Sequence, residues 1–165
     1  MIDESDKSLF RSAVNQQMPI DKDGDKEEAY NNKKHWNKPF EDYSYLPKPN
    51  LSASDFVSHS QAGVSPKTVK KMKQGRIGYA PSIDLHGQKV EEAFQSLSKF
   101  MHYHGDERFI HIIHGKGYNS DQNLSILKSQ VVYYLKQHPQ VLAFCSCPQK
   151  IGGTGAVYVY LKDNV

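Results

Sequence analysis

After residue 80 the chain alternates between two kinds of apolar pattern, and this alternation limits its possible folds more than any other feature. Short, nearly continuous apolar runs are typical of buried strands, and apolar spacings of three and four residues are typical of helices. Alternating strands and helices imply a sheet that is at least partly parallel. We expect a small two-layer α/β domain over residues 81–163, with a four-stranded mixed sheet and two helices. Its elements follow one another in the order βαβαββ. The predicted strands are 82–86, 109–113, 141–147 and 156–161, and the predicted helices are 89–104 and 121–137.

Residues 1–80 carry weaker signals, and we expect a largely irregular N-terminal extension with short helices. A short helix fits the first 20 residues, and a mixed-charge linker follows at residues 21–28. This linker is not a calcium loop, because the positions that require glycine and a bidentate acid are Lys26 and Asn32. Aromatic residues among prolines at residues 31–50 predict extended chain. These aromatics either dock on this protein's own domain, a twin subunit or a larger assembly, or stay disordered until bound.

A basic segment without acids precedes the first predicted strand. Ser65-Pro66 is typical of a helix start. A solvated helix face is the usual meaning of such a run. The functional alternative is a helix that contacts nucleic-acid phosphates. On that alternative, the predicted nucleic-acid-binding residues are Lys70, Lys71, Lys73 and Arg76.

An acid and an imidazole lie two residues apart at the end of the first strand, at Asp84 and His86. Residues two apart on a strand share a face, so these side chains are expected to project together. The second strand is followed by another polar, glycine-containing loop, residues 114–117. If the two strands are parallel neighbours, both junctions lie at one edge of the sheet, where helix N-termini favour an anion.

The residue types at this edge favour a phosphate as ligand. Glycines let the backbone approach a phosphate closely, and a lysine supplies a point charge. A zinc site formed by Asp84, His86 and His114 with a water is the metal alternative; we rank it lower and assign no metal. The predicted catalytic residues are therefore Asp84, His86 and His114, and the predicted phosphate-binding residues are Gly87, Gly115, Lys116 and Gly117. A glycine-rich segment at residues 151–155 either borders the site or forms the turn between the last two strands.

Charge, cysteine content and hydropathy limit the partners and the cellular compartment that we expect. The net charge of +3 is compatible with a nucleic-acid partner. Cys145 and Cys147 are too far apart along one strand for an unstrained disulfide, which predicts buried thiols in a reducing compartment. No apolar run reaches the ~20 residues that span a bilayer, and the first residues are too polar for a signal peptide. We expect a cytoplasmic protein without a membrane partner, and the sequence leaves its oligomeric state open.

Three motifs together resemble the small MutS-related (Smr) domain family. They are Ile-Asp-Leu-His-Gly followed by Glu92-Ala93, Ile-Ile-His-Gly-Lys-Gly, and Gly-Gly-Thr-Gly-Ala, in order over about residues 83–162. The resemblance implies a compact α/β domain that cleaves or nicks nucleic acid. Within the family, the chain looks closest to the stand-alone SmrA-type DNA endonucleases. The second choice is the SmrB type, which cuts messenger RNA on collided ribosomes.

We therefore expect a nucleic-acid phosphodiesterase, with a DNA-nicking endonuclease as the first hypothesis. One imidazole, His86 or His114, would act as general base and the other as acid, while Asp84 orients the nearer one and Lys116 holds the phosphate. Each positioned acid–base group contributes about 10²–10⁴-fold, too little for fast DNA hydrolysis unless a divalent cation joins in. No other cofactor is expected. The first alternative is an endoribonuclease that cuts mRNA on stalled ribosomes, where the substrate's 2′-hydroxyl attacks. The second is a non-catalytic nucleic-acid-binding module.

Overall fold

The computed structural model describes residues 38–117 and 124–163. The short helix predicted in the first 20 residues, the charged linker at 21–28 and the helix start predicted near residue 121 lie outside this range. Among the described residues, the elements are β1 (Ser58–Ser60), α3 (Pro66–Lys73), β2 (Ser82–Asp84), α4 (Val90–Tyr103), β3 (Phe109–Ile113), α5 (Ile126–Gln137), β4 (Val141–Ser146), the 3₁₀ turns η1 (Gln149–Ile151) and η2 (Gly153–Gly155), and β5 (Ala156–Leu161). No helix among them is long and apolar enough to cross a bilayer.

The described strands form one mixed sheet in the order β1-β4-β5-β3-β2. The β2–β3 pair is parallel, and the β3–β5, β4–β5 and β1–β4 pairs are antiparallel. This confirms the predicted α/β class and the order of four strands and two helices after residue 81. The sheet has a fifth strand, β1, because residues 58–60 of the predicted extension pair with the edge of β4.

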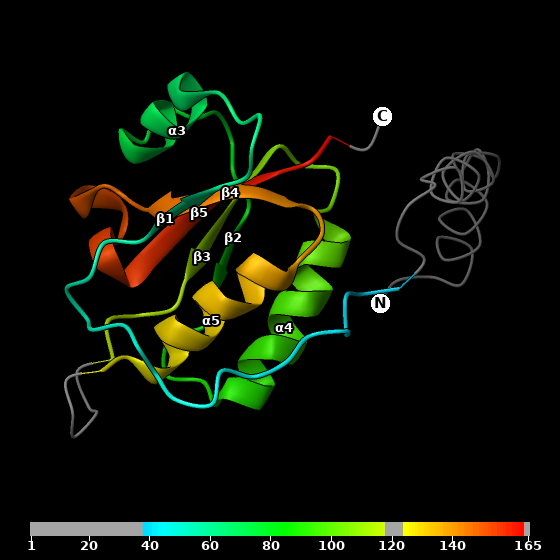
Figure 1. Ribbon diagram of the computed structural model, residues 1–165, viewed down its shortest axis with the longest axis vertical. Helices are drawn as coiled ribbons and strands as arrows, with labels where there is room; N and C mark the ends of the chain where they lie inside the picture. The colour runs from blue at the N-terminus through cyan, green and yellow to red at the C-terminus, as the bar shows by residue number, and fades with distance from the viewer. Residues whose placement is uncertain (1–37, 118–123, 164–165) are drawn as a thin grey trace, which may run out of the picture. The chain divides into compact units, whose positions relative to one another are not determined.

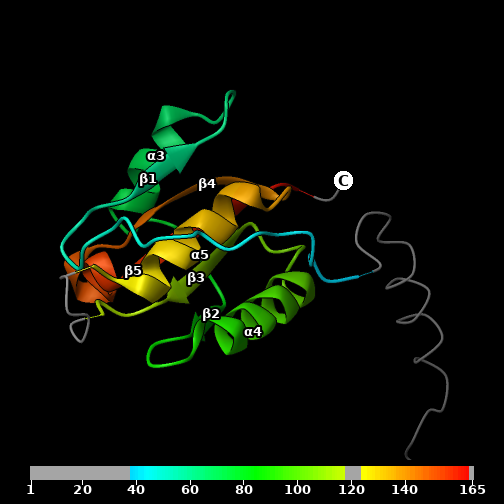
Figure 2. The ribbon, with the colours of Figure 1, turned by 60° about the horizontal axis from the view of Figure 1, so that its bottom comes forward.

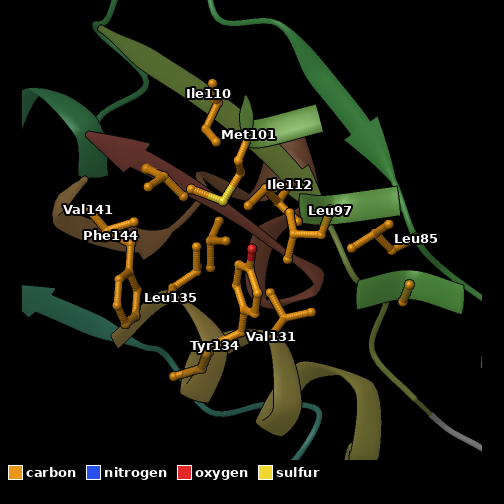
Figure 3. Close-up of a cluster of buried hydrophobic side chains, with 14 of the residues drawn as sticks. Leu85, Leu97, Met101, Ile110, Ile112, Val131, Tyr134, Leu135, Val141 and Phe144 are labelled. Atoms are coloured by element: carbon orange, nitrogen blue, oxygen red, sulfur yellow. The ribbon is translucent and has the colours of Figure 1, made fainter. Parts of the chain in front are cut away.

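Helices α4 and α5 cover one face of the sheet, and α3 packs on β4 at the other face (Figures 1 and 2). Apolar side chains of α4, α5 and alternate strand positions meet in one core (Figure 3). Its members include Leu97 and Met101 from α4, Tyr134 from α5, and Ile110 and Ile112 from β3, all without exposed surface. The other face is closed partly by Met72 of α3, which packs with the two buried cysteines and Tyr158.

Two predicted boundaries differ from the structure by two residues or more, for local reasons. β2 ends at Asp84 rather than at residue 86, because the backbone N–H of His86 turns back to donate to the Asp84 carboxylate at 3.0 Å. Helix α5 begins at Ile126, because Leu124 and Ser125, the described residues that were predicted to precede it in the helix, are not helical. Leu124 is still extended and forms an isolated bridge with Ser52, so the helix cannot start before it.

An extended strap, residues 40–57, lies along α5 (Figures 1 and 2). Side chains of the helix hold its backbone. The Gln137 amide bonds both the N–H and the carbonyl of Ser44, at 2.9 and 3.0 Å. The Gln130 amide does the same for Leu46, at 2.9 and 2.8 Å. These paired bonds satisfy an extended backbone that has no neighbouring strand at this point.

The aromatic residues of the strap pack on the chain's own domain. The Phe40 and Tyr43 rings lie 5.8 and 5.1 Å from the Tyr134 ring, and Tyr43 lies 5.1 Å from Phe94. Such ring pairs add to the stabilisation from burial alone. Of the alternatives for residues 31–50, the structure therefore shows docking on this protein's own domain for the described residues 38–50.

Candidate functional site

The ends of β2 and β3 lie side by side, as the sequence predicts for parallel neighbours. Asp84 is opposite Ile113 in the ladder, and the N–H of Leu85 donates to the Ile113 carbonyl at 2.7 Å. The loops that follow also meet, because a Cβ at Gly115 would lie 3.1 Å from the Cβ of His86. The two predicted halves of the site therefore share one edge of the sheet.

Asp84 and His86 form a hydrogen-bonded pair at this edge. The Asp84 Oδ1 atom lies 2.6 Å from His86 Nδ1 and 3.0 Å from the His86 backbone nitrogen. The His86 and Asp84 side chains are 69% and 49% exposed. A carboxylate can only accept, so Nδ1 carries the proton of this bond. That tautomer leaves Nε2 as the free, basic nitrogen of an imidazole open to solvent.

The electrostatics of Asp84 favour its ionised form. Partial burial raises the pKa of the carboxyl group, but hydrogen bonds from the side chain and backbone of His86 and the charge of His111 outweigh this effect. The net result is an Asp84 pKa below its usual value. The carboxylate is therefore charged at neutral pH and able to stabilise a protonated His86.

His114 differs from His86 in nearly every respect. Its side chain is 2% exposed, and its Nδ1 donates to the carbonyl of Gly115 at 2.8 Å. Burial, opposed by the hydrogen bond to Gly115 and assisted by the charge of Lys128, lowers the pKa of His114 to about 4. Its Nε2 is buried without a hydrogen-bond partner among the described residues. At neutral pH His114 is thus an uncharged imidazole with no proton on Nε2.

The predicted phosphate-binding glycines lie in left-handed conformations, with φ of +74° at Gly87, +79° at Gly115 and +69° at Gly117. Side chains are also excluded at Gly117, where a Cβ would lie 2.6 Å from Ser125 Oγ. Lys116 is half-buried within this loop. These residues follow β2 and β3 at the edge that carries the acid–imidazole pair.

The glycine-rich segment combines both of its predicted roles. It forms the turn η2 before β5, and it also borders the second loop. The carbonyl of Gly155 accepts the backbone N–H groups of His114 and Gly115, at 3.0 and 2.9 Å. A Cβ at Gly155 would lie 3.2 Å from Lys116 Cγ. The turn therefore fixes the position of the loop that carries Lys116.

Sequence reasoning missed His111 and Ser82 as neighbours of the pair. They are partners in the β2–β3 ladder, and Ser82 Oγ lies 3.0 Å from His111 Nδ1. The imidazole of His111 is half-buried. Burial lowers its pKa, whereas the backbone of Ile151 and the charge of Asp84 act in the opposite direction. The available signal was the alternation along the strand, which puts His111 on the same face as Asp84 once the register is known.

The basic residues predicted to bind nucleic acid are exposed on α3 and the turn after it. They are Lys70, Lys71, Lys73 and Arg76. The turn packs on η1, where a Cβ at Gly75 would lie 3.1 Å from Pro148 and 3.2 Å from Ile151. Hydrogen bonds and ion pairs of the described residues do not connect these four cations with Asp84 or His86. Within the same part of the chain, no group of three or more His, Cys, Asp or Glu side chains could hold a metal ion.

Comparison with known proteins identifies relatives over most of the chain. Residues 83–162 match the Smr domain family. The chain is 30% identical to the ribosome rescue factor SmrB of Tolumonas auensis, covering 99% of this chain and 97% of that protein. It is 32% identical to the SmrB of Buchnera aphidicola subsp. Acyrthosiphon pisum (strain Tuc7). That alignment covers 74% of this chain and 63% of the relative's length. The crystal structure of YdaL, a stand-alone small MutS-related protein from Escherichia coli, superimposes with a TM-score of 0.59 at 28% identity, over 68% of this chain and 88% of YdaL.

Proposed function

Because this chain belongs to the Smr domain family, we propose that it is an endonuclease whose substrate is single-stranded RNA, namely messenger RNA on ribosomes. The observation that carries the proposal is the Asp84–His86 pair, which leaves an exposed imidazole nitrogen free beside a glycine loop and a lysine. The relative that aligns over nearly its whole length is named a ribosome rescue factor. That name favours RNA as the substrate, whereas the sequence analysis had ranked DNA first.

RNA also suits the chemistry of the site. His86 Nε2 takes the proton of a ribose 2′-hydroxyl, and the resulting oxygen attacks the adjacent phosphorus. The bond from phosphorus to the 5′-oxygen breaks, that oxygen takes a proton from solvent, and a 2′,3′-cyclic phosphate remains. The Asp84 carboxylate stabilises the imidazolium formed on His86. Lys116 and the backbone N–H groups of the loop stabilise the additional negative charge on the phosphate.

His114 has a positioning role in this proposal. An acid needs a proton on the atom that faces the substrate, and His114 Nε2 has none at neutral pH because its pKa is about 4. Its Nδ1–H instead fixes the carbonyl of Gly115, next to Lys116. We assign residues 81–163 as the nuclease domain proper. Within the extension, residues 1–80, the strap and β1 add to the fold of this domain. The rest of the extension, which includes the basic helix α3, supplies contacts to the ribosome.

One set of assays tests the proposal and its competitors. The purified protein is incubated with single-stranded RNA and with supercoiled plasmid, each with and without chelator. Cyclic phosphate ends on RNA, insensitive to chelator, are the expected result. Relaxed plasmid with intact RNA would instead support DNA nicking. Salt-dependent binding without cutting of either substrate would support a non-catalytic module.

Matched variants connect the activity to the site. His86→Ala is expected to slow RNA cutting by about 10²–10⁴-fold, the usual contribution of a positioned base. His104→Ala removes an imidazole at the end of α4 and should leave the rate unchanged. Equal rates for wild type and a double Asp84→Ala/His86→Ala variant would show that the reaction takes place elsewhere.

A further inference from the structure

The open face of the sheet carries an aromatic row next to the acid–imidazole pair. Ladder partners on β3 and β5 place Phe109 beside Tyr160, and His111 beside Tyr158. The intervening residues Ile110 and Val159 point into the α4–α5 core, so these four side chains project to the opposite face. Each pair of ladder partners forms one row across this face. The first row is Phe109–Tyr160, the second is His111–Tyr158, and the rows follow one another toward the end of β3.

The acid–imidazole pair lies at the far end of these rows. Ser82 extends the His111–Tyr158 row and Asp84 extends the row of Ile113, because β2 and β3 are in parallel register. Phe109 and Ile113 are four residues apart, which corresponds to about 13 Å along the strand. A chain of a few nucleotides can cover this distance.

The aromatic row is only partly closed by other elements. Helix α3 packs on β4, where Met72 covers the cysteines and Tyr158. Phe109, His111 and Tyr160 remain half-buried, and Ser82 and Asp84 are exposed. Ile77 and Ala80 also pack on this face, and the His111 side chain lies against the Ile151 backbone with its Nε2 buried. The accessible surface is therefore the Phe109–Tyr160 end of the face and the exposed edge at Ser82 and Asp84.

The first row has the composition of a base-stacking site. The Phe109 and Tyr160 rings stack with centroids 5.2 Å apart and planes at 28°. The guanidinium carbon of the exposed Arg108 lies 5.7 Å from the Phe109 ring and 5.6 Å from the Tyr160 ring. Aromatic rings on a sheet stack on the bases of single-stranded RNA, and arginine adds stacking and charge toward the backbone phosphates.

We propose that Arg108, Phe109 and Tyr160 form a binding site for the bases of single-stranded RNA, next to the cleavage centre. The site binds a base two or more nucleotides away from the phosphate at His86 and so aligns the strand across β3. This inference rests on the proposed function for the identity of its ligand. It assigns a role to a surface that takes no part in the cleavage chemistry.

Binding measurements test the site separately from cleavage. The probes are a fluorescein-labelled 12-nucleotide oligouridine and a matched 12-mer of abasic riboses, measured by anisotropy in a His86→Ala background that keeps the RNA intact. The double variant Phe109→Leu/Tyr160→Leu keeps apolar side chains but loses the rings. We expect it to weaken oligouridine binding by about 5- to 150-fold and abasic binding less than about 2-fold. Tyr103→Leu, which removes a 68% exposed aromatic side chain from α4, should change neither.

Three outcomes decide between stacking and a merely structural ring pair. Unchanged oligouridine affinity, or equal losses on both probes, would overturn the proposal. Log affinity falls as log salt rises, and Arg108→Gln should make this fall less steep by about 1 unit of slope. An unchanged slope would contradict the role of the Arg108 charge. If the double variant fails to fold, the single variants Phe109→Leu and Tyr160→Leu are compared on the same probes. The two proposals can fail separately. If the wild-type protein cuts no RNA but the ring variants still bind oligouridine more weakly than their parent, the proposed function is refuted and the stacking site is supported.

Discussion

Replacing Lys128 by methionine removes an ammonium group from a buried position and leaves a side chain of similar length. Lys128 lies on α5 without exposed surface. Its Nζ donates to the backbone carbonyls of Ser52 at 3.0 Å, Ala53 at 3.4 Å and Asp55 at 2.5 Å. These carbonyls belong to the strap, so one side chain of the helix fixes the backbone of residues 52–55 at three points.

The size of the effect follows from these contacts. A hydrogen bond to a charged group contributes about 1.5–3 kcal/mol. The cost of burying the ammonium reduces the net value, and burial accordingly lowers the pKa of Lys128, with the Asp55 carboxylate acting against this. Water can also reach the strap carbonyl at the exposed residue Asp55 once the ammonium is gone. We expect Lys128→Met to reduce the free energy of unfolding by about 2–4 kcal/mol.

Urea unfolding measures this loss. With a slope of about 2 kcal/mol per molar urea, the midpoint should fall by about 1–2 M. Lys136→Met is the matched control, because Lys136 is an exposed lysine on the same helix, and its effect should stay within about 0.5 kcal/mol. Limited proteolysis should also cut the strap of the Lys128 variant earlier than that of wild type. A Lys128→Met variant no less stable than the control would refute the structural role of these bonds.

Three further predictions follow from local geometry. Gly63→Ala and Gly152→Ala both force alanine into a positive φ, +89° and +105°, but only at Gly152 would the Cβ lie 2.7 Å from another atom, the Cβ of Ala156. Thermal unfolding should show a loss of about 1 kcal/mol at Gly63 and at least about 2 kcal/mol at Gly152, and equal losses would contradict the clash. Burial lowers the pKa values of His114 and His138 to about 4, below the usual 6.5, so the unfolded chain binds more protons between these values. Stability should be fully present above pH 6.5 and fall toward pH 4 by at most about 1.4 kcal/mol per pH unit for each imidazole, and equal stability by urea unfolding at pH 7 and 4.5 would contradict this. Gln130→Leu removes both bonds to the Leu46 backbone, so exchange of the Leu46 amide hydrogen should speed up while that of Val57, bonded to Ser146 Oγ, keeps its rate; no difference would show that the strap has other anchors.

The parts of the fold with regular apolar spacing could be predicted from the sequence. Strands β3 and β5 begin and end where the prediction put them, and α4 differs by one residue at each end. The strap could not be predicted in the same way, because extended chain without a strand partner has no apolar period. Its anchors on α5, Lys128, Ser129 and Gln130, are polar residues that a helical pattern assigns to solvent. They are buried because the strap covers them, which depends on a contact between residues about 80 positions apart.

The candidate site was predictable to the extent that it depends on topology. Parallel pairing of two adjacent strands is enough to place the Asp84 and Lys116 loops at one edge. The sequence could not indicate how deeply each imidazole lies, since burial is decided by segments that are remote in the chain. The carbonyl of Gly155 holds the backbone of His114 and Gly115, while His86 stays open because Gly87 turns the chain away after it. Two similar junctions therefore give one exposed and one buried imidazole.

This difference in burial changes which proton transfers the site can support. A symmetrical pair of imidazoles would let either act as base and the other as acid, as sequence reasoning had assumed. The carbonyl of Gly115 can only accept a hydrogen bond, so it fixes the proton of His114 on Nδ1. The Asp84 carboxylate fixes the proton of His86 on Nδ1 in the same way, but there Nε2 is open to solvent. Of these two imidazoles, only His86 presents its Nε2 to solvent, where a bound substrate can reach it. A site with a single working base is better matched to a substrate that supplies its own nucleophile, and the ribose 2′-hydroxyl of RNA is such a group.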